Sequence, residues 1–462
     1  MATWTRLALL TLLVGACSPA TLKADGGADD DDGATADAST DAGPGLLTVV
    51  VLDNAARPQP GVKVAFFERD GTLIDMVVTG DDGTAAMEVF PDAMVAIGRS
   101  GNEMRIEVVA GAQPGETLEL GPPVGERSGA QLGTAQARLP FSLAGATRYL
   151  AGTCYLNQQT VGTVFTHNFQ DSDCTRGATT QDLLAVALDN NSNALAYALI
   201  PGVLVNSPTT FDAGAWNTDF RRPSLTLLDA PFDGNLDLNV KLYRNDVEYQ
   251  YDGSHTPLAA IAIDQNASVD LIYPPNFADK VNVELNAQSA SNDRIVVWAS
   301  NLAPTIGAQT VDLTSGMLPP VDQTAYVIDD PARPEWQYRI NGDAAEATAQ
   351  LHVAAISDPS IEAFYLLVVT APPDHPAPFR MPALPPEIIM NPNDPTQPAW
   401  PPSAGASFPL YYSALYHATF VPSYQSFRTN RGLGSIFGDQ IVSRDVAVGG
   451  TARVSLGGLL GN

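Results

Sequence analysis

Hydrophobic and polar residues alternate along most of the chain after its first 45 residues. Strict alternation recurs over residues 236–242, 247–251, 281–285, 336–340 and 349–353. A period of two gives a strand one buried face and one wet face, which is typical of antiparallel sheets. Turn signals interrupt the pattern at short intervals, as they do in β-sandwiches. The sequence therefore predicts an all-β protein of tandem antiparallel sandwiches, immunoglobulin-like or transthyretin-like in kind.

One apolar stretch, residues 179–188, fits two interpretations. It could be a capped helix, but Leu184, Val186 and Leu188 also alternate, and the polar run at 190–193 suits a hairpin turn. Because such a turn joins two strands, the stretch is predicted to be a strand.

The N-terminal end has a different pattern. Residues 7–14 form an apolar run of eight, and Arg6 is the only charged side chain among the first 22 residues. A membrane-spanning helix needs about 20 apolar residues. The shorter run therefore predicts a signal peptide over residues 1–16.

The end of this leader resembles the lipobox of bacterial lipoproteins, in the residues Val14-Gly15-Ala16-Cys17. The resemblance implies cleavage before Cys17, a thioether-linked diacylglycerol on its sulfur and acylation of the new amino group. Two or three acyl chains hold a protein stably on a lipid bilayer. Ser18 fits the outer-membrane sorting pattern of some Gram-negative bacteria, so the predicted address is the outer membrane. The alternative is an ordinary secretory leader with an incidental Cys17.

Residues 17–45 are predicted to be a disordered acidic tether. Residues 24–45 carry seven Asp and no basic residue. Like charges repel, and nothing in this stretch can be buried, so it should be extended. The run Asp30-x-Asp32-Gly33 half-matches a calcium loop, but Ala28 occupies the position of the first ligand. A solvated spacer is the favoured interpretation.

Residues 46–121 form the first predicted sandwich. The segment from Pro58 to Val64 matches the entry P-x-x-G-V-x-V, and Thr79 to Gly83 is a turn near T-D-x-x-G, with Gly80 in place of Asp. These motifs resemble the carboxypeptidase regulatory-like domain, a transthyretin-like sandwich. The resemblance implies a non-catalytic module and no site residues.

Three further sandwiches are predicted, over residues 132–208, 209–320 and 321–457. The stretch from Phe141 to Tyr149 resembles part of fibronectin type III-like modules, which implies binding or spacing. The last sandwich is interrupted at 371–409, where thirteen of 39 residues are Pro. Such a stretch cannot pair as a central strand. It is expected to be either a surface excursion or a wrap over the sandwich.

Charge narrows the choice of partners. The 462 residues include 24 Lys and Arg against 51 Asp and Glu, a net charge of −27, and only four Lys. Nucleic acids repel such a surface, so no nucleic-acid partner is expected.

Two cysteines remain after Cys17. An exported chain with the pair Cys154 and Cys174 predicts a disulfide. In the chain-entropy model, closing a loop of this size stabilises a fold by roughly 3 kcal/mol. The alternative is two buried thiols.

Enzyme motifs are scarce. No G-x-S-x-G elbow, H-E-x-x-H motif or phosphate-binding loop occurs in the sequence. His352 lies at a polar position of its predicted strand and is expected to be exposed to solvent. We expect no cofactor, no metal, no catalytic residues and no enzyme. A cryptic hydrolase whose carboxylates converge in space is the remaining alternative.

Four aromatic residues, Trp400, Tyr411, Tyr412 and Tyr416, cluster beside the Pro-rich stretch. Aromatic faces stack on sugar rings, so these residues are a candidate platform for a glycan or another polymer. Alternatively Tyr412 and Tyr416 are core, and Trp400 fixes the loop. The leading hypothesis is a lipid-anchored, non-enzymatic envelope module for structure, adhesion or binding, whose polysaccharide or protein partner is unknown.

Overall fold

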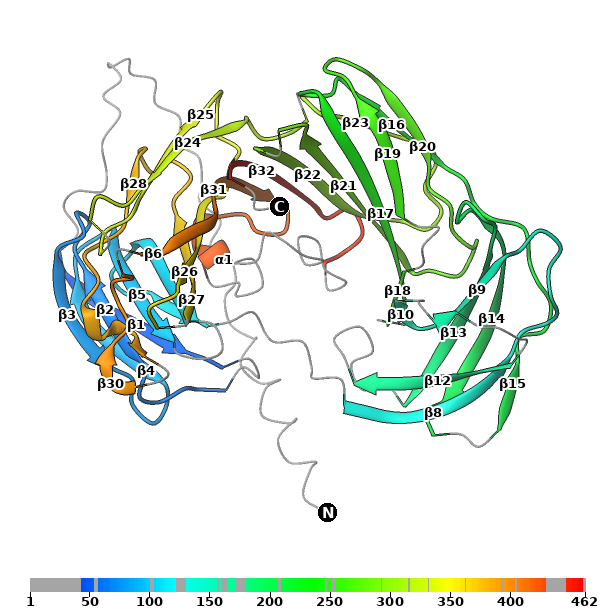
Figure 1. Cartoon of the computed structure of the whole chain (residues 1–462), viewed down its shortest axis with the longest axis horizontal. Helices are drawn as coiled ribbons and strands as arrows, with labels where there is room; N and C mark the ends of the chain where they lie inside the picture. Colours follow the sequence, from blue (N-terminus) through cyan, green and yellow to red (C-terminus); the bar gives the residue numbers. More distant parts are fainter. Residues whose placement is uncertain are drawn as a thin grey trace, which may run out of the picture. The chain divides into compact units, whose positions relative to one another are not determined.

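Strands dominate the structure (Figure 1). It is a computed structural model that describes residues 43–53, 57–99, 104–121, 130–155, 158–159, 164–171, 179–206, 209–245, 247–250, 255–291, 293–314, 316–330, 332–361, 363–391, 394–403, 405–428 and 446–459. Among these residues, helical structure is limited to α1 (Tyr424–Arg428) and the 3-10 turn η2 (Pro386–Ile388). The predicted all-β class of antiparallel sandwiches is confirmed.

The first sandwich packs a three-stranded sheet, in the order β4-β1-β7, against four strands of a larger sheet. The strands are β1 (Gly45–Val51), β2 (Lys63–Phe67), β3 (Leu73–Val78), β4 (Thr84–Val89), β5 (Ala93–Arg99), β6 (Met104–Ala112) and β7 (Thr117–Leu120). Leu47 and Val49 of β1 share a buried cluster with Val64 and Phe66 of β2. The alternation in β1 places these side chains on one face, which explains the pairing of the two layers.

The second sandwich has sheets in the orders β12-β8-β15 and β11-β9-β13-β14. Its strands are β8 (Ala130–Arg138), β9 (Arg148–Gly152), β10 (Cys154–Tyr155), β11 (Gln158–Gln159), β12 (Val164–Asp171), β13 (Thr180–Leu188), β14 (Ala194–Leu204) and β15 (Thr210–Asp212). The predicted strand at 179–188 is β13. Leu183 faces the core within this sandwich, whereas Leu184 faces a cluster shared with the third. Both faces of β13 are covered, which explains its nearly continuous apolar run.

The third sandwich packs the sheet β20-β16-β23 against the long strands of the larger sheet. Its strands are β16 (Ser224–Leu228), β17 (Gly234–Arg244), β18 (Val247–Gln250), β19 (His255–Ile261), β20 (Ala267–Asp270), β21 (Lys280–Ser289), β22 (Arg294–Leu302) and β23 (Gln309–Asp312). The alternating residues of β17, such as Leu236, Leu238 and Val240, are buried in its core. The strict alternation therefore predicted this strand and its buried face.

The fourth range combines the small sheet β24-β25-β28 with four strands of the larger sheet. Its elements are β24 (Val321–Val327), β25 (Glu335–Ile340), β26 (Ala349–Asp358), β27 (Ala363–Ala371), β28 (Phe379–Arg380), β29 (Met390–Asn391), β30 (Asp394–Pro398), β31 (Ser407–Ala418) and β32 (Thr451–Leu459). The paired strands β29 and β30 belong to the Pro-rich stretch.

One sheet runs through all four ranges. Its order is β10-β18-β17-β21-β22-β32-β31-β26-β27-β6-β5-β2-β3, with β19 paired to β17. The first and fourth ranges meet where β6 pairs with β27 in parallel. The third and fourth meet where β22 pairs with β32. The second and third meet where β10 pairs with β18 in parallel. Hydrogen-bonded ladders therefore join the sequence ranges that were predicted as separate sandwiches, while the boundaries themselves remain predictions.

The Pro-rich stretch is a wrap over the sheet, which was one of the two alternatives. Phe379, Met381 and Ile388 are fully buried in a cluster that also holds Phe67 of β2 and Ile356 of β26. The wrap lies so close to β5 that a Cβ on Gly98 would collide with the carbonyl oxygen of Ile388. The wrap therefore covers one face of the sheet on both sides of the β6–β27 pairing.

His352 corrects one expectation from the sequence. It occupies a polar position of β26 but is fully buried, because the small sheet and the wrap cover the face that alternation alone assigns to solvent. Its ring stacks on Phe379 at 5.0 Å, and its Nδ1 lies 2.9 Å from the Ser413 hydroxyl. Burial lowers the pKa of His352 to about 3, so the imidazole is neutral at pH 7.

Candidate functional site

The predicted covalent sites lie largely outside the described residues. Cys17 and Cys174 are both among the residues for which nothing is described, and Cys154 begins β10. Lipidation and the disulfide therefore stay predictions. Within the described part of the chain, no helix has the length and apolar character needed to span a bilayer.

The predicted aromatic platform is corrected by the structure. Trp400, Tyr412 and Tyr416 are 2%, 3% and 2% exposed, and Tyr411 is half-buried with its ring stacked on Tyr326. The physical reason is that both faces of β31 are covered. Tyr412 and Tyr416 lie in one buried cluster, and Tyr411 packs against another that holds Trp400. Rings buried in this way cannot offer a face to a sugar. Tyr412 and Tyr416 are core residues, as the alternative interpretation had it.

Trp400 holds the end of the wrap. Its ring packs edge-on against Tyr365 of β27 at 6.2 Å, and the Tyr365 hydroxyl donates to the carbonyl of Ala399 at 2.5 Å. The peptide before it is therefore bound directly to the sheet. This contact fixes the loop, which is the role that the alternative gave to Trp400.

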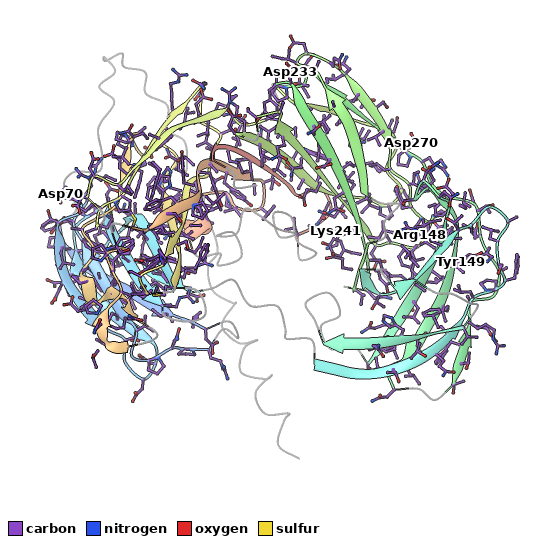
Figure 2. All side chains as sticks on the ribbon, in the orientation of Figure 1. Asp70, Arg148, Tyr149, Asp233, Lys241 and Asp270 are labelled. Atoms are coloured by element: carbon purple, nitrogen blue, oxygen red, sulfur yellow. The ribbon has the colours of Figure 1, made fainter. Side chains whose placement is uncertain are left out.

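Aromatic rings do reach the surface in the second sandwich. Phe141 is 57% exposed, and its carbonyl accepts a hydrogen bond from Trp216 Nε1 at 2.6 Å. The Trp216 ring stacks on Tyr149 of β9, with centroids 5.7 Å apart and planes at 28°. Tyr149 is labelled beside Arg148 in Figure 2. We name Phe141, Tyr149 and Trp216 the surface aromatic cluster.

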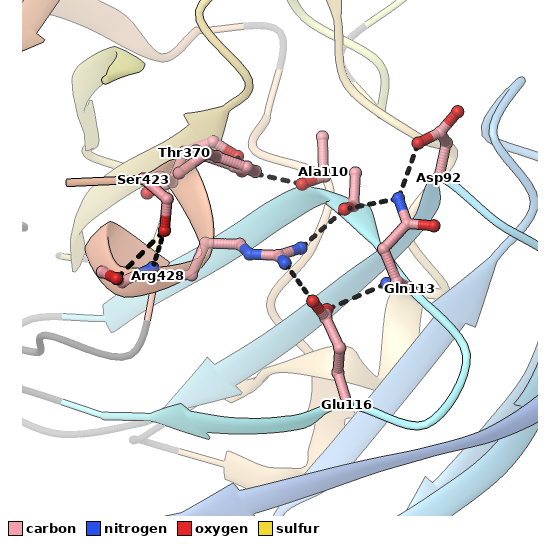
Figure 3. A network of polar contacts seen from close by, with 10 residues as sticks. Asp92, Ala110, Gln113, Glu116, Thr370, Ser423 and Arg428 are labelled. Atoms are coloured by element: carbon pink, nitrogen blue, oxygen red, sulfur yellow. Dashed lines mark hydrogen bonds and ion pairs between the residues drawn. The ribbon is translucent and has the colours of Figure 1, made fainter. Parts of the chain in front are cut away.

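The first and fourth ranges are also joined by a buried polar network around α1 (Figure 3). The Arg428 side chain is 2% exposed and pairs with Glu116 at 2.5 Å. Its other terminal nitrogen donates to the carbonyl of Gly111 at 2.6 Å. The second carboxylate oxygen of Glu116 accepts from the backbone of Gln113 at 2.9 Å, and the Gln113 side chain donates to Asp92. A buried charge needs such compensation, and here the compensation comes from the first sandwich.

Tyr424 extends this network to the ladder itself. Its hydroxyl lies 2.7 Å from the carbonyl of Ala110 in β6 and 3.0 Å from that of Thr370 in β27. The Arg428 guanidinium lies 4.8 Å from the centre of the Tyr424 ring, within range of a cation–π contact. Burial raises the pKa of Tyr424, so its hydroxyl stays protonated. We call Tyr424, Arg428 and Glu116 the clamp.

The sequence analysis missed the clamp, although a local signal exists. Pro422 and Ser423 precede Tyr424, and the Ser423 hydroxyl accepts from the backbone of Ser426 at 3.1 Å, as a helix cap does. Tyr424, Phe427 and Arg428 then follow at helical spacing. This pattern could have predicted a short helix. Its partner Glu116 could not be predicted, because 312 residues separate it from Arg428.

A related network joins the second and third sandwiches. Arg244 pairs with Asp182 of β13 at 2.5 Å and donates to the carbonyl of Phe277 at 2.6 Å. Asp182 also accepts from the backbone of Gly202 at 2.7 Å, and its carbonyl accepts from the Tyr249 hydroxyl at 2.6 Å. The Arg244 side chain is 24% exposed, so water reaches this pair more readily than the clamp.

An open cavity of about 390 Å³ lies beside α1, at the ends of β31 and β32. Its lining residues are Ala345, Glu346, Ala347, Thr348, Pro373, His417, Pro422, Ser423, Tyr424 and Arg453. Arg453 pairs with Glu346 at 2.8 Å, and the Thr348 hydroxyl lies 3.5 Å from His417 Nδ1. Burial and the charge of Arg453 hold the pKa of His417 below its usual range. The imidazole is therefore neutral at pH 7.

Metal binding by the described residues would require a group of ligating side chains. Across the described residues, no group of three or more His, Cys, Asp and Glu side chains is placed to hold a metal ion. The six polar lining side chains of the cavity together offer hydrogen-bond donors and acceptors.

Comparison with known proteins leaves the family open. No family model matches the sequence, and no curated protein matches it. Among solved structures, the TIE protein of Bacillus anthracis is similar over 58% of this chain and 49% of its own, at 10% identity and a TM-score of 0.14. The chain therefore spans about half the length of that protein.

Two further solved structures have similar values. BcpA, the major pilin subunit of Bacillus cereus, is 7% identical over 58% of this chain and 98% of its own, with a TM-score of 0.14. The pilus adhesin SpaC of Lactobacillus rhamnosus GG is 8% identical over 71% of this chain and 44% of its own, with a TM-score of 0.14. None of these values assigns the chain to a family.

Proposed function

We propose that the chain is a non-enzymatic envelope lipoprotein that acts as a stiff structural or adhesive element. The observation that carries this proposal is the single sheet that continues through all four ranges. Domains joined only by linkers move relative to one another by default. A shared ladder of hydrogen bonds and a shared core oppose such motion, as at the β6–β27 pairing.

The buried ion pairs support the same proposal. Arg428–Glu116 links the first and fourth ranges, and Arg244–Asp182 links the second and third. Removing one partner of such a pair leaves a buried charge without compensation. Each pair also fixes how its two ranges pack, because the two charges meet only in one relative position of those ranges. Such an arrangement suits a protein that has to keep its parts in fixed register under load.

The N-terminal anchor is the second part of the proposal. In this arrangement the lipid on Cys17 holds the chain on the outer membrane, and the acidic tether extends from it to β1. Tension would then enter the fold at β1, which pairs with β4 on one side and β7 on the other. Leu47, Val49 and Val51 of this strand are fully buried, so pulling β1 out would expose core side chains.

Detergent partitioning of the full chain, expressed with its own leader in a Gram-negative bacterium, tests the anchor. The wild type should enter the detergent phase and incorporate labelled palmitate. Cys17→Ala should lose both properties, whereas the matched control Cys154→Ala should keep them. An unlabelled wild type that stays in the aqueous phase would overturn the lipoprotein assignment.

Calorimetry of the water-soluble Cys17→Ala chain tests the stiff element separately. Ranges that share a ladder and a core should unfold together, so one main transition is expected, with a calorimetric enthalpy equal to the van't Hoff enthalpy. Four resolved transitions would show independent domains and would count against this proposal while leaving the anchor intact.

A further inference from the structure

We infer that the cavity beside α1 is a binding site for a neutral, hydroxyl-rich small molecule, such as a single sugar or polyol unit. This site is independent of the proposed structural function. It also differs from the aromatic platform expected from the sequence, whose rings are buried.

The size and walls of the cavity suit a small ligand. Its volume of about 390 Å³ falls in the range of small-molecule sites, roughly 300–1,000 Å³. The walls come from the ends of strands in the central sheet and from Pro373 and Pro422, which have restricted backbones. A site built on such elements is preformed, so binding requires little ordering.

The charges of the site favour a neutral ligand. Among the described lining residues, the formal charges belong to Arg453 and Glu346, which pair with each other at 2.8 Å. Arg453 also donates to the carbonyl of Gly316 at 3.2 Å. An anion would have to compete with Glu346 for Arg453, and the chain's net charge of −27 repels anions in general. A cation would meet the same competition at Glu346.

The hydrogen-bonding groups favour hydroxyls. Among the described residues, the Thr348 hydroxyl has long contacts, at 3.5 Å to His417 and 3.4 Å to the carbonyl of Val421. Hydroxyl hydrogen bonds are normally near 2.7–2.8 Å, so a ligand hydroxyl could give this group a shorter bond than either of these. A neutral imidazole has one donor and one acceptor nitrogen. Thr348 and His417 together therefore match neighbouring hydroxyls, each of which donates and accepts.

The apolar residues of the cavity wall favour a ligand that also has an apolar face made of C–H groups. Ala345, Ala347, Pro373 and Pro422 present apolar surface beside the polar groups. A sugar ring has both kinds of surface, whereas a hydrocarbon would form no hydrogen bond with Thr348 or His417. Tyr424 lines the same cavity and belongs to the clamp. Occupancy should therefore raise the thermal stability of the β6–β27 join.

Titration of the full chain carrying Cys17→Ala tests the inference. The probes are glucose, galactose and mannose, with glucuronate and glucosamine as charged analogues, measured by calorimetry and by the shift in Tm. A neutral sugar should bind and raise Tm. Thr348→Val should weaken binding by about tenfold, the effect of one lost hydrogen bond. The matched control Thr210→Val, in β15 and outside the cavity, should leave binding unchanged.

A second variant guards against misfolding. The Glu346 side chain is 70% exposed, so Glu346→Gln should fold normally, and freeing Arg453 should shift preference toward glucuronate. Failure of all three neutral sugars to bind at millimolar concentration would overturn the inference. A wild type that prefers glucuronate or glucosamine would also overturn it. Binding that survives Thr348→Val and is lost in Trp216→Ala would place the site at the surface aromatic cluster instead.

Discussion

The contact between the first and fourth ranges differs in construction from the contact between the second and third sandwiches. Six residue pairs, from Tyr365–Met104 to Thr370–Val109, connect β27 with β6, and within the described residues two pairs connect β10 with β18. The second and third sandwiches instead share a face-to-face core, because side chains of β13 lie in the same cluster as those of β17. The first join thus depends on a ladder and the second on apolar burial.

The buried ion pair at each of these contacts also differs in its exposure to water. At the ladder join, Arg428 is 2% exposed and Glu116 9%, so the clamp is closed to water. At the face-packed join, Arg244 is 24% exposed and Asp182 11%. Both carboxylates accept a backbone N–H, so the two pairs differ in the exposure of the arginine. Loss of the cation should therefore matter more in the first case. The following experiments test this contrast from the largest expected effect to the smallest.

Removing the two arginines in turn compares the joins directly. Arg428→Met should lower the free energy of unfolding by about 3–5 kcal/mol, because Glu116 would stay buried without its partner. Arg244→Met should cost about 1.5–3 kcal/mol, the range for a hydrogen bond to a charged group. Urea unfolding of the Cys17→Ala chain measures both. The double variant Arg428→Met with Glu116→Gln should recover part of the loss, and equal losses at the two joins would contradict the contrast.

Lowering the pH should destabilise the fourth range and the second sandwich over different pH ranges, because each contains a buried histidine. Burial lowers the pKa of His352 to about 3 and that of His167, in β12 of the second sandwich, to about 4. Both are neutral when folded and gain a proton on unfolding below their ordinary pKa of 6.5. Above pH 6.5 neither histidine lowers the free energy of unfolding. Below pH 6.5 the unfolded state takes up the proton, so each histidine lowers the free energy of unfolding by ~1.4 kcal/mol per pH unit as the pH falls.

The pH ranges over which the two histidines destabilise the fold end at different pH values. The loss through His167 should stop near pH 4, whereas the loss through His352 should continue toward pH 3. His352→Gln should reduce the slope of unfolding free energy against pH by ~1.4 kcal/mol per unit between about pH 4 and 6. An unchanged slope in that variant would mean that His352 does not titrate on unfolding.

The close approach of Gly98 in β5 to Ile388 tests, with a smaller expected effect, whether the wrap lies on the sheet. Gly98→Ala should cost about 1–3 kcal/mol, because the new methyl group would collide with the carbonyl of Ile388 and displace the wrap. Gly307→Ala is the matched control, since no atom lies within 4 Å of the new Cβ. It should change stability by less than about 0.5 kcal/mol. Similar effects of the two substitutions would show that the wrap does not lie against β5.

Local pattern could predict the strands, since alternation depends only on near neighbours in sequence. It predicted β17 and its buried face, and it also found β13. It failed at His352, because a polar position in an alternating strand is exposed only if nothing covers that face, and here the wrap does. Whether the Pro-rich stretch lies on the sheet depends on contacts such as Ile388 with β5, which no local pattern contains.

The joins and the candidate site could not be predicted for the same reason. Met104 pairs with Tyr365, and nothing near either residue specifies the other. Thr348 and His417 meet across 69 residues of sequence. The aromatic run at 411–416 looked like a platform because aromatic residues serve both cores and surfaces. Only the clusters that cover both faces of β31 decide in favour of the core.

Hydrogen exchange at increasing urea, followed by mass spectrometry, tests the central claim most directly. If the ladder makes the first and fourth ranges one cooperative unit, peptides from β6 and β27 should lose protection at the same urea concentration as those from β1 and β32. Arg428→Met should shift all of them together. Peptides from the first sandwich that exchange in a separate step, at lower urea than those from β26 to β32, would contradict the claim.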